Sequence, residues 1–154
     1  MTDQPHVATF GAGCFWGIET AFSRLPGITE TSVGFMGGRL ENPTYDAVCI
    51  GNTGHAEVVR AHYEPDAISY NKLLELFWVI HDPTTWVRSN PDIASQYRSA
   101  IFYHTPEQHL LAEQSKSAAQ PRHRNAIATE ITPAGVYYLA DDYHQKFEKK
   151  QGWA

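Results

Sequence analysis

The sequence predicts one α+β domain, a two-layer α/β sandwich with a mixed central sheet. Strand-like and helix-like segments follow one another irregularly along the 154 residues, without the glycine-rich turn of a doubly wound nucleotide-binding sheet. Hydrophobic residues make up 42% of the chain and charged residues 19%, which is a globular balance. A chain of this length buries a core without disulfide or metal support, so we expect a single domain over residues 1–154.

The first half of the chain contains three predicted strands and two predicted helices. Residues 7–10 have a strand pattern, and the helix that opens at Cys14 has apolar residues at helical spacing. Further strands are expected at 28–35 and 56–63, the second because hydrophobic and polar residues alternate there. Ser69 is a typical N-cap residue for the next helix.

The second half is predicted to add two strands and two helices. A strand over 96–104 precedes the sequence TPEQ at 105–108, whose N-cap residue, proline and glutamine mark the start of a helix ending near residue 119. Residues 126–132 are expected to form a strand and 140–149 a final amphipathic helix. We expect the sandwich to have a ferredoxin-like core.

Composition and charge exclude several classes of protein. The net charge is −5 and the basic residues are scattered, which argues against nucleic-acid binding. Residues 1–6 are polar and do not form a signal peptide, and no segment approaches the roughly 18 apolar residues of a membrane span. We therefore expect a cytoplasmic monomer that binds neither nucleic acid nor a membrane.

Two cysteines, Cys14 and Cys49, are too few for a disulfide scaffold. Cys14 lies between a predicted strand and the start of a predicted helix, where the helix dipole lowers the pKa of a thiol. The glycines on either side of it, Gly13 and Gly17, leave the backbone free to approach a ligand. Position alone leaves two interpretations open, a reactive thiol or a small buried hydrophobic residue.

The pentapeptide GCFWG at 13–17 resembles the signature of the A-type methionine sulfoxide reductases. Five further segments are similar to motifs of that family, in family order and at about family spacing: GFMGG at 34–38, NPTY at 42–45, GHAE at 54–57, HDPT at 81–84 and QYRSAI at 96–101. The resemblance implies that Cys14 reduces methionine S-sulfoxide, free or within peptides, and that no bound cofactor is needed.

Reduction of a sulfoxide requires a thiolate, a proton donor that is protonated near pH 7 and a pocket for the thioether methyl group. Strand alternation places Glu57 on the same face as Val59, Ala61 and Tyr63, and burial there raises the pKa of a carboxyl. The alternative is a surface glutamate on an edge strand. The match to GHAE implies that Glu57 is the general acid.

The resemblance also implies roles for five residues that would otherwise be interpreted as core packing or surface residues. Tyr45 and Tyr97 are similar to the family tyrosines whose hydroxyls hold the sulfoxide oxygen, a task suited to neutral hydrogen-bond donors. Phe15 and Trp16 are expected to form the apolar wall around the substrate methyl group. Asp92 matches a family aspartate at the same site, although residues 88–95 lack the glycines that usually flank it.

The sequence differs from many family members because no cysteine lies near its C-terminal end. Such cysteines resolve the sulfenic acid formed on the nucleophile. Cys49 is flanked by apolar residues, which favours a packing role, with a resolving role as the alternative. We therefore expect an external thiol to recycle Cys14, either glutathione with glutaredoxin or thioredoxin.

Two other functions are compatible with a reactive Cys14, namely a thiol peroxidase and a non-catalytic module that binds oxidised methionine. The aromatic pair and Glu57 fit a sulfoxide better than a peroxide. The eight histidines do not form a zinc-binding pattern, so no metal site is expected.

Overall fold

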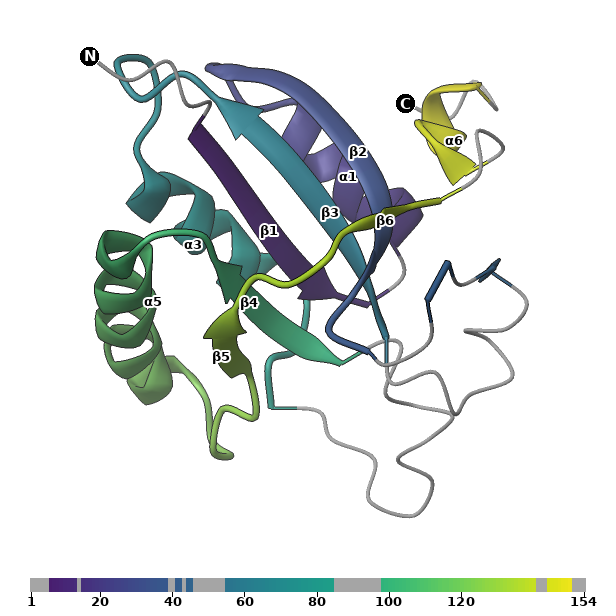
Figure 1. Cartoon of the computed structure of the whole chain (residues 1–154). Coiled ribbons are helices and arrows are strands. Elements are labelled where there is room, and N and C mark those ends of the chain that lie inside the picture. The colour runs from purple at the N-terminus through teal and green to yellow at the C-terminus, as the bar shows by residue number, and fades with distance from the viewer. Residues whose placement is uncertain are drawn as a thin grey trace.

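The computed structural model describes residues 6–13, 15–38, 41–42, 44–45, 55–84, 98–140 and 144–150. Cys14, Cys49, Asp92 and Tyr97 lie outside these ranges. In chain order the elements are β1 (His6–Ala12), α1 (Phe15–Ser23), β2 (Ile28–Met36), β3 (Ala56–Tyr63), α3 (Tyr70–Val79), β4 (Ser99–Tyr103), α5 (Pro106–Ala119), the 3-10 helix η2 (Gln120–Arg122), β5 (Glu130–Pro133), β6 (Tyr138–Leu139) and α6 (Phe147–Lys150) (Figure 1).

The six strands form one mixed sheet in the order β5-β4-β1-β3-β2-β6. Neighbouring strands are antiparallel except β4 and β5, which run parallel. The four central strands and the helices α1 and α3 follow the order β-α-β-β-α-β, with β4-β1-β3-β2 side by side in space, which is a ferredoxin-like core. The predicted α+β sandwich is therefore confirmed.

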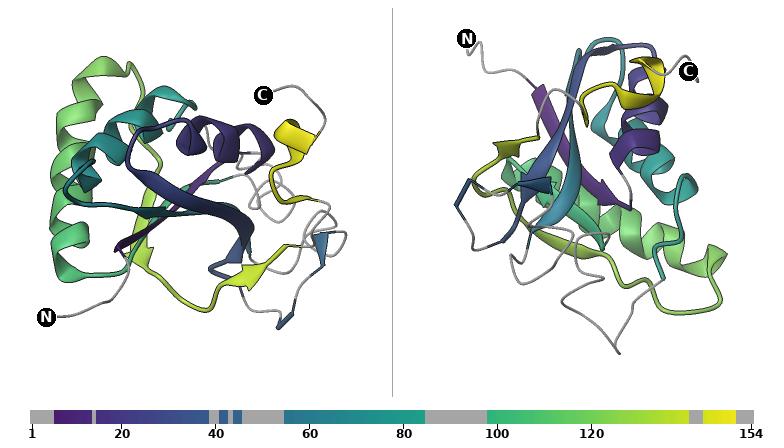
Figure 2. Two further views of the ribbon diagram at one scale, coloured as in Figure 1. Left: turned by 90° about the horizontal axis from the view of Figure 1, so that it is seen from above. Right: turned by 90° about the vertical axis from the view of Figure 1, so that its right-hand side faces the viewer.

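Helices α1, α3 and α5 cover one face of the sheet (Figure 2, left). The main core lies between these two layers, because apolar side chains recur at helical spacing on the helices and at alternate positions on the strands. Phe10 of β1 lies at its centre, with its ring 5.1 Å from that of Phe22 and 5.2 Å from that of Phe77. This packing holds the C-terminal turn of α1 and helix α3 against the sheet.

Residues 134–137, which we call the strap, connect β5 at one edge of the sheet with β6 at the other and cross its second face (Figure 1). A smaller apolar cluster lies there, with Ala134 and Tyr137 packed against Met36, Ala56, Val58, Ala100 and Phe102. The guanidinium carbon of Arg60 lies 5.1 Å from the centre of the Tyr137 ring. The sheet is thus covered by helices on one side and by the strap on the other.

The predicted N-caps of two helices, Ser69 and Thr105, are confirmed. The Ser69 hydroxyl accepts a hydrogen bond from the backbone N–H of Lys72 at 3.2 Å and caps α3. The Thr105 hydroxyl does the same for the N–H of Gln108 at 3.1 Å and caps α5. Each cap satisfies a backbone donor that the helix leaves without an intrahelical partner.

The prediction of a strand over 126–132 is wrong for its first half, since β5 begins only at Glu130. The Ala128 N–H bonds to the carbonyl of Pro83, and the Lys116 ammonium bonds to the carbonyl of Thr129. The backbone before Glu130 is therefore hydrogen bonded to the residues that follow α3 and to a side chain of α5, and not to a strand.

The prediction of a helix over 140–149 is wrong at its start and correct only for residues 147–149, which lie in α6. Ala140 continues the β6 ladder, with its N–H bonded to the Val33 carbonyl at 3.0 Å. The following α6 covers only Phe147–Lys150, and Lys146 has a left-handed φ of 51° that a helix does not allow. Strand β6 itself was not predicted.

Candidate active site

Glu57 is the buried carboxyl group of the predicted site. It lies on β3 with its side chain on the helix-covered face, the face of Val59 and Tyr63, and it is only 1% exposed. Strand alternation requires this orientation, since residues 57, 59 and 63 share one face of a pleated strand. The predicted orientation of Glu57 is confirmed.

The Glu57 carboxylate lies at the N-terminal end of α1. Its Oε1 accepts a hydrogen bond from the backbone N–H of Phe15 at 3.3 Å, and Phe15 is the first residue of that helix. The same N–H belongs to the peptide bond that joins residues 14 and 15. The carboxyl group is therefore adjacent in space to the peptide unit of the cysteine motif.

Burial raises the pKa of Glu57 from its usual 4.5 to about 7, and the hydrogen bond from Phe15 lowers it by a smaller amount. Removal from water disfavours the charged form, whereas a donor to the carboxylate favours it. Near neutral pH this group is therefore present in both protonation states, which is the condition for a general acid at physiological pH.

Aromatic side chains gather beside this carboxyl group. Tyr45 stacks against Trp16 with ring centres 6.5 Å apart, and it lies 6.1 Å from Phe15. Phe15 is fully buried, while Trp16 and Tyr45 are partly buried. The structure thus brings three of the predicted site residues together with Glu57.

His144 and Phe147, which the sequence interpretation did not assign to the site, complete this aromatic wall. The imidazole of His144 lies 4.3 Å from the Tyr45 ring, and Phe147 stacks on Trp16 with ring centres 3.8 Å apart. Both residues lie in the segment expected to be an amphipathic helix, where nothing in the local pattern marked them. The tertiary fold brings His144 and Phe147 into contact with Trp16 of α1.

The Trp16 indole N–H donates a hydrogen bond to Nδ1 of His144 at 3.1 Å. An indole nitrogen cannot accept, so Nδ1 of His144 is the acceptor and the proton of the neutral ring is on Nε2. This bond fixes the plane of the Trp16 ring relative to His144. The wall is consequently held by this hydrogen bond as well as by stacking.

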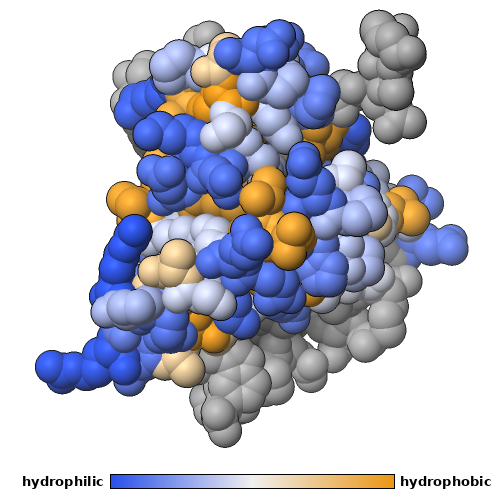
Figure 3. All heavy atoms as spheres, turned by 90° about the vertical axis from the view of Figure 1, so that its left-hand side faces the viewer, coloured by the Kyte–Doolittle hydropathy of each residue, from blue (hydrophilic) through white to orange (hydrophobic). Residues whose placement is uncertain are grey.

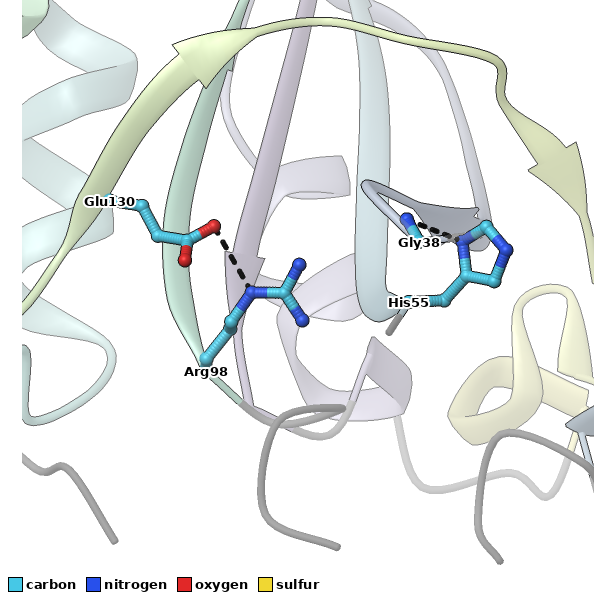
Figure 4. A network of polar contacts seen from close by, with 4 residues as sticks. All are labelled: Gly38, His55, Arg98 and Glu130. Atoms are coloured by element: carbon cyan, nitrogen blue, oxygen red, sulfur yellow. Dashed lines mark hydrogen bonds and ion pairs between the residues drawn. The ribbon is translucent and has the colours of Figure 1, made fainter. Parts of the chain in front are cut away.

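Two polar contacts fix the strand ends that border the site (Figure 4). Nδ1 of His55 accepts a hydrogen bond from the Gly38 N–H at 3.0 Å, which joins the start of β3 to the residues after β2. Nε of Arg98 bonds to Oε1 of Glu130 at 3.1 Å, which joins the start of β4 to β5. Arg98 directly follows the predicted site residue Tyr97 in the chain.

Four predicted residues cannot be placed relative to this group, because Cys14, Cys49, Asp92 and Tyr97 lie outside the described residues. Among the residues that are described, no three histidine, cysteine, aspartate or glutamate side chains are grouped as a metal site would require. None of the described helices is both long and apolar enough to cross a membrane.

Comparison with known proteins agrees with this geometry. A family model described as peptide methionine sulfoxide reductase matches residues 6–153. The peptide methionine sulfoxide reductase MsrA of Methanoculleus marisnigri is 56% identical over 147 residues, which cover 94% of this chain and 90% of that protein.

Two crystal structures of Mxr1 from Saccharomyces cerevisiae are similar to the fold. The reduced form has a TM-score of 0.89 and 33% sequence identity, covering 100% of this chain and 90% of that chain. The complex with Trx2 has a TM-score of 0.68 and 27% sequence identity, covering 96% of this chain and 87% of that chain. A buried carboxyl at a helix start, an aromatic wall and a family model that spans almost every residue together place this chain in the peptide methionine sulfoxide reductase family.

Proposed function

We propose that this chain reduces methionine sulfoxide to methionine, with Cys14 as the nucleophile and Glu57 as the proton donor. The observation that carries the proposal is the buried Glu57 carboxyl, whose pKa is raised to about 7 and which accepts a hydrogen bond from the residue next to Cys14. Cys14 directly precedes α1 in the chain, and the N-terminal end of a helix favours a thiolate.

In the first step the Cys14 thiolate attacks the sulfur of the sulfoxide. The sulfur–sulfur bond formed by this attack then breaks together with the sulfur–oxygen bond of the substrate, the oxygen moves to the Cys14 sulfur, and Glu57 supplies the proton that this oxygen needs. The products are methionine and a cysteine sulfenic acid, so the substrate sulfur gains the two electrons that the cysteine sulfur loses. Neutral Glu57 suits this step because a carboxylate has no proton to give.

The remaining site residues bind the substrate in this proposal. The hydroxyls of Tyr45 and Tyr97 donate hydrogen bonds to the sulfoxide oxygen, Phe15 and Trp16 contact the methyl group, and Asp92 orients the substrate. The substrate is the S epimer, free or within a protein. The contacts of Tyr45 with Phe15 and Trp16 support the assignment of one pocket to oxygen and methyl group together.

An external thiol then resolves the sulfenic acid. Its sulfur bonds to Cys14 as water leaves, and a second thiol reduces the resulting disulfide. The structure of Mxr1 in complex with Trx2 supports a thioredoxin as this reductant. Glutathione with glutaredoxin is the other external reductant of the proposal, and both operate in the cytoplasm, where we place the protein.

The test is to incubate the protein with each methionine sulfoxide epimer and dithiothreitol, and to measure methionine. The S epimer is expected to react, and Cys14→Ser is expected to abolish the product. Without reductant, the protein should form one equivalent of methionine and gain the mass of one oxygen atom. Binding of the sulfoxide without any product would indicate a non-catalytic module and overturn the proposal.

Cys49→Ser is the matched control for recycling. The variant is expected to retain turnover with thioredoxin or with glutathione and glutaredoxin, because the resolving thiol comes from outside the chain. Loss of turnover in a folded Cys49→Ser protein that still makes one equivalent of methionine would instead identify Cys49 as the resolving thiol.

A further inference from the structure

Glu19 is a second buried carboxyl group, and the reaction described above does not use it. It lies within α1, is 1% exposed and faces the C-terminal part of the chain. Its Oε1 accepts a hydrogen bond from the backbone N–H of Lys146 at 2.6 Å, and its Oε2 accepts one from the Thr31 hydroxyl at 2.8 Å. A buried carboxylate needs such donors, since its removal from water is otherwise costly.

Residues 144–147, which we call the clasp, are attached to β2 as well. The Gln145 side-chain amide pairs with both backbone groups of Val33, at 2.9 Å to its N–H and 2.8 Å to its carbonyl. It thereby adds to the hydrogen bonding at the edge of β2 where the β6 ladder ends, since the Val33 carbonyl also accepts the Ala140 N–H. The Lys146 ammonium also bonds to the Thr31 carbonyl at 3.1 Å.

The clasp supplies two members of the aromatic wall. His144 lies two residues before Lys146 and accepts the hydrogen bond from Trp16, and Phe147 follows Lys146 and stacks on the same indole. Between them, Lys146 has a φ of 51°, a conformation that non-glycine residues adopt only when their surroundings impose it. The four residues of α6 are too few to hold a helix in place by themselves.

Trp16 and Glu19 are three residues apart on α1 and therefore project from the same side of the helix. One turn of α1 thus contacts the clasp twice: Trp16 contacts the side chains of His144 and Phe147, and Glu19 accepts the hydrogen bond from the Lys146 N–H. We propose that Glu19 is a positioning residue of the substrate pocket, which holds His144 and Phe147 against Trp16 through the N–H of Lys146. This inference rests on the proposed function, because it assigns the wall to substrate binding.

The test compares Glu19→Ala with Thr31→Val. Glu19→Ala removes the acceptor of the Lys146 N–H, so we expect KM for a methionine sulfoxide peptide to rise about 10-fold or more, with kcat little changed. The rate at which iodoacetamide alkylates Cys14 should stay the same. Glu19→Gln keeps an acceptor oxygen and should restore most of the affinity.

Thr31→Val is the matched control, since it removes the other hydrogen bond to the same carboxylate and leaves the Lys146 bond intact. It should lower stability while changing KM less than about twofold. Equal increases in KM for Thr31→Val and Glu19→Ala, or no increase for either, would overturn the positioning role. Gln145→Ala removes the hydrogen bonds between the clasp and β2 and is expected to raise KM as Glu19→Ala does. It replaces Glu19→Ala in the test if Glu19→Ala does not fold.

The NMR resonance of the Trp16 indole N–H provides a readout that needs no turnover. It should shift towards the value of a water-bonded indole in Glu19→Ala and Gln145→Ala, and stay in place in Thr31→Val. A wild-type protein that makes no methionine would overturn the proposed function, whereas an unmoved indole resonance in Glu19→Ala would overturn the positioning role. The two failures are therefore distinguishable.

Discussion

At the scale of single residues, the position of Glu57 makes the protein sensitive to pH. Its pKa of about 7 in the folded state lies above the usual 4.5 because burial penalises the charged form. Below pH 4.5 the group is neutral in both the folded and the unfolded chain and has no effect on stability. As the pH rises towards 7 and beyond, ionisation increasingly favours the unfolded chain.

The first prediction follows from this difference. The free energy of unfolding should lose about 3 kcal/mol through Glu57 between about pH 4.5 and about pH 8. Glu57→Gln has nearly the same shape and no charge, so this part of the pH dependence should disappear. Urea denaturation of both proteins across this range measures the difference, and parallel curves would contradict the raised pKa.

The second prediction concerns the reaction rate. Glu57→Gln removes the proton donor, and the rate of methionine formation should fall about 100-fold or more. In the wild type the donor is lost as the pH rises through about 7, so the variant should lack that part of the pH profile. Cys14 alkylation is the control, because a variant with an unreactive thiol would lose activity for a different reason.

The residues of the site differ in how far the sequence could predict them. The burial of Glu57 follows from strand alternation, and its contact with Phe15 brings together two motifs that the sequence had marked. His144 and Glu19 could not be found in this way, because their partners lie 128 and 127 residues away, respectively, in Trp16 and Lys146. No local pattern encodes a contact over that distance.

At the scale of elements, the sequence was most informative where local chemistry decides the structure. Strand β3 has the predicted bounds, and α3 and α5 start at the predicted caps, since alternation and capping depend on neighbouring residues. The predictions for 126–132 and 140–149 were wrong at the start of each segment, because long-range hydrogen bonds to Pro83 and Val33 determine the backbone at Ala128 and Ala140. Periodicity does not report such partners.

The pairing of β2 with β6 gives the third prediction. A Cβ atom at Gly34 would lie 2.3 Å from the Tyr138 carbonyl oxygen and 2.7 Å from a ring carbon of Tyr137. Gly34→Ala should therefore displace β6 and reduce the free energy of unfolding by about 1–3 kcal/mol. Gly135→Ala is the control, since no atom lies within 4 Å of its Cβ position. Equal thermal stability of the two variants would contradict the close contact.

At the scale of the whole molecule, the two faces of the sheet are stabilised differently. The helix layer buries the large core, whereas the strap covers a small cluster on the other face. On the α5 side of the molecule, hydrophobic side chains are separated by hydrophilic ones and form no continuous apolar area (Figure 3). Leu110 of α5 is one of the exposed hydrophobic residues, at 58%.

The fourth prediction tests the strap through Tyr137, whose hydroxyl is hydrogen bonded to that of Ser32 at 2.7 Å. Tyr137→Phe loses this bond but keeps the ring beside Arg60, and should cost about 1 kcal/mol of stability. Tyr137→Ala also loses the packing and should cost about 3 kcal/mol. Chemical denaturation measures both, and wild-type stability in Tyr137→Ala would mean that the strap contributes nothing.

The outermost strands have a consequence for behaviour at high concentration. The edge strands of an open sheet have unpaired backbone groups, and a strand of another chain can pair with them, which is a common route to fibrils. Here the edge strand β5 has four residues and includes Pro133, and the edge strand β6 has two residues. Each edge of the sheet therefore has few free backbone groups with which a further strand could pair. At the β6 edge, the Gln145 side chain is also hydrogen bonded to the backbone N–H and carbonyl of Val33. Both edges of the sheet therefore disfavour the addition of a strand from another chain.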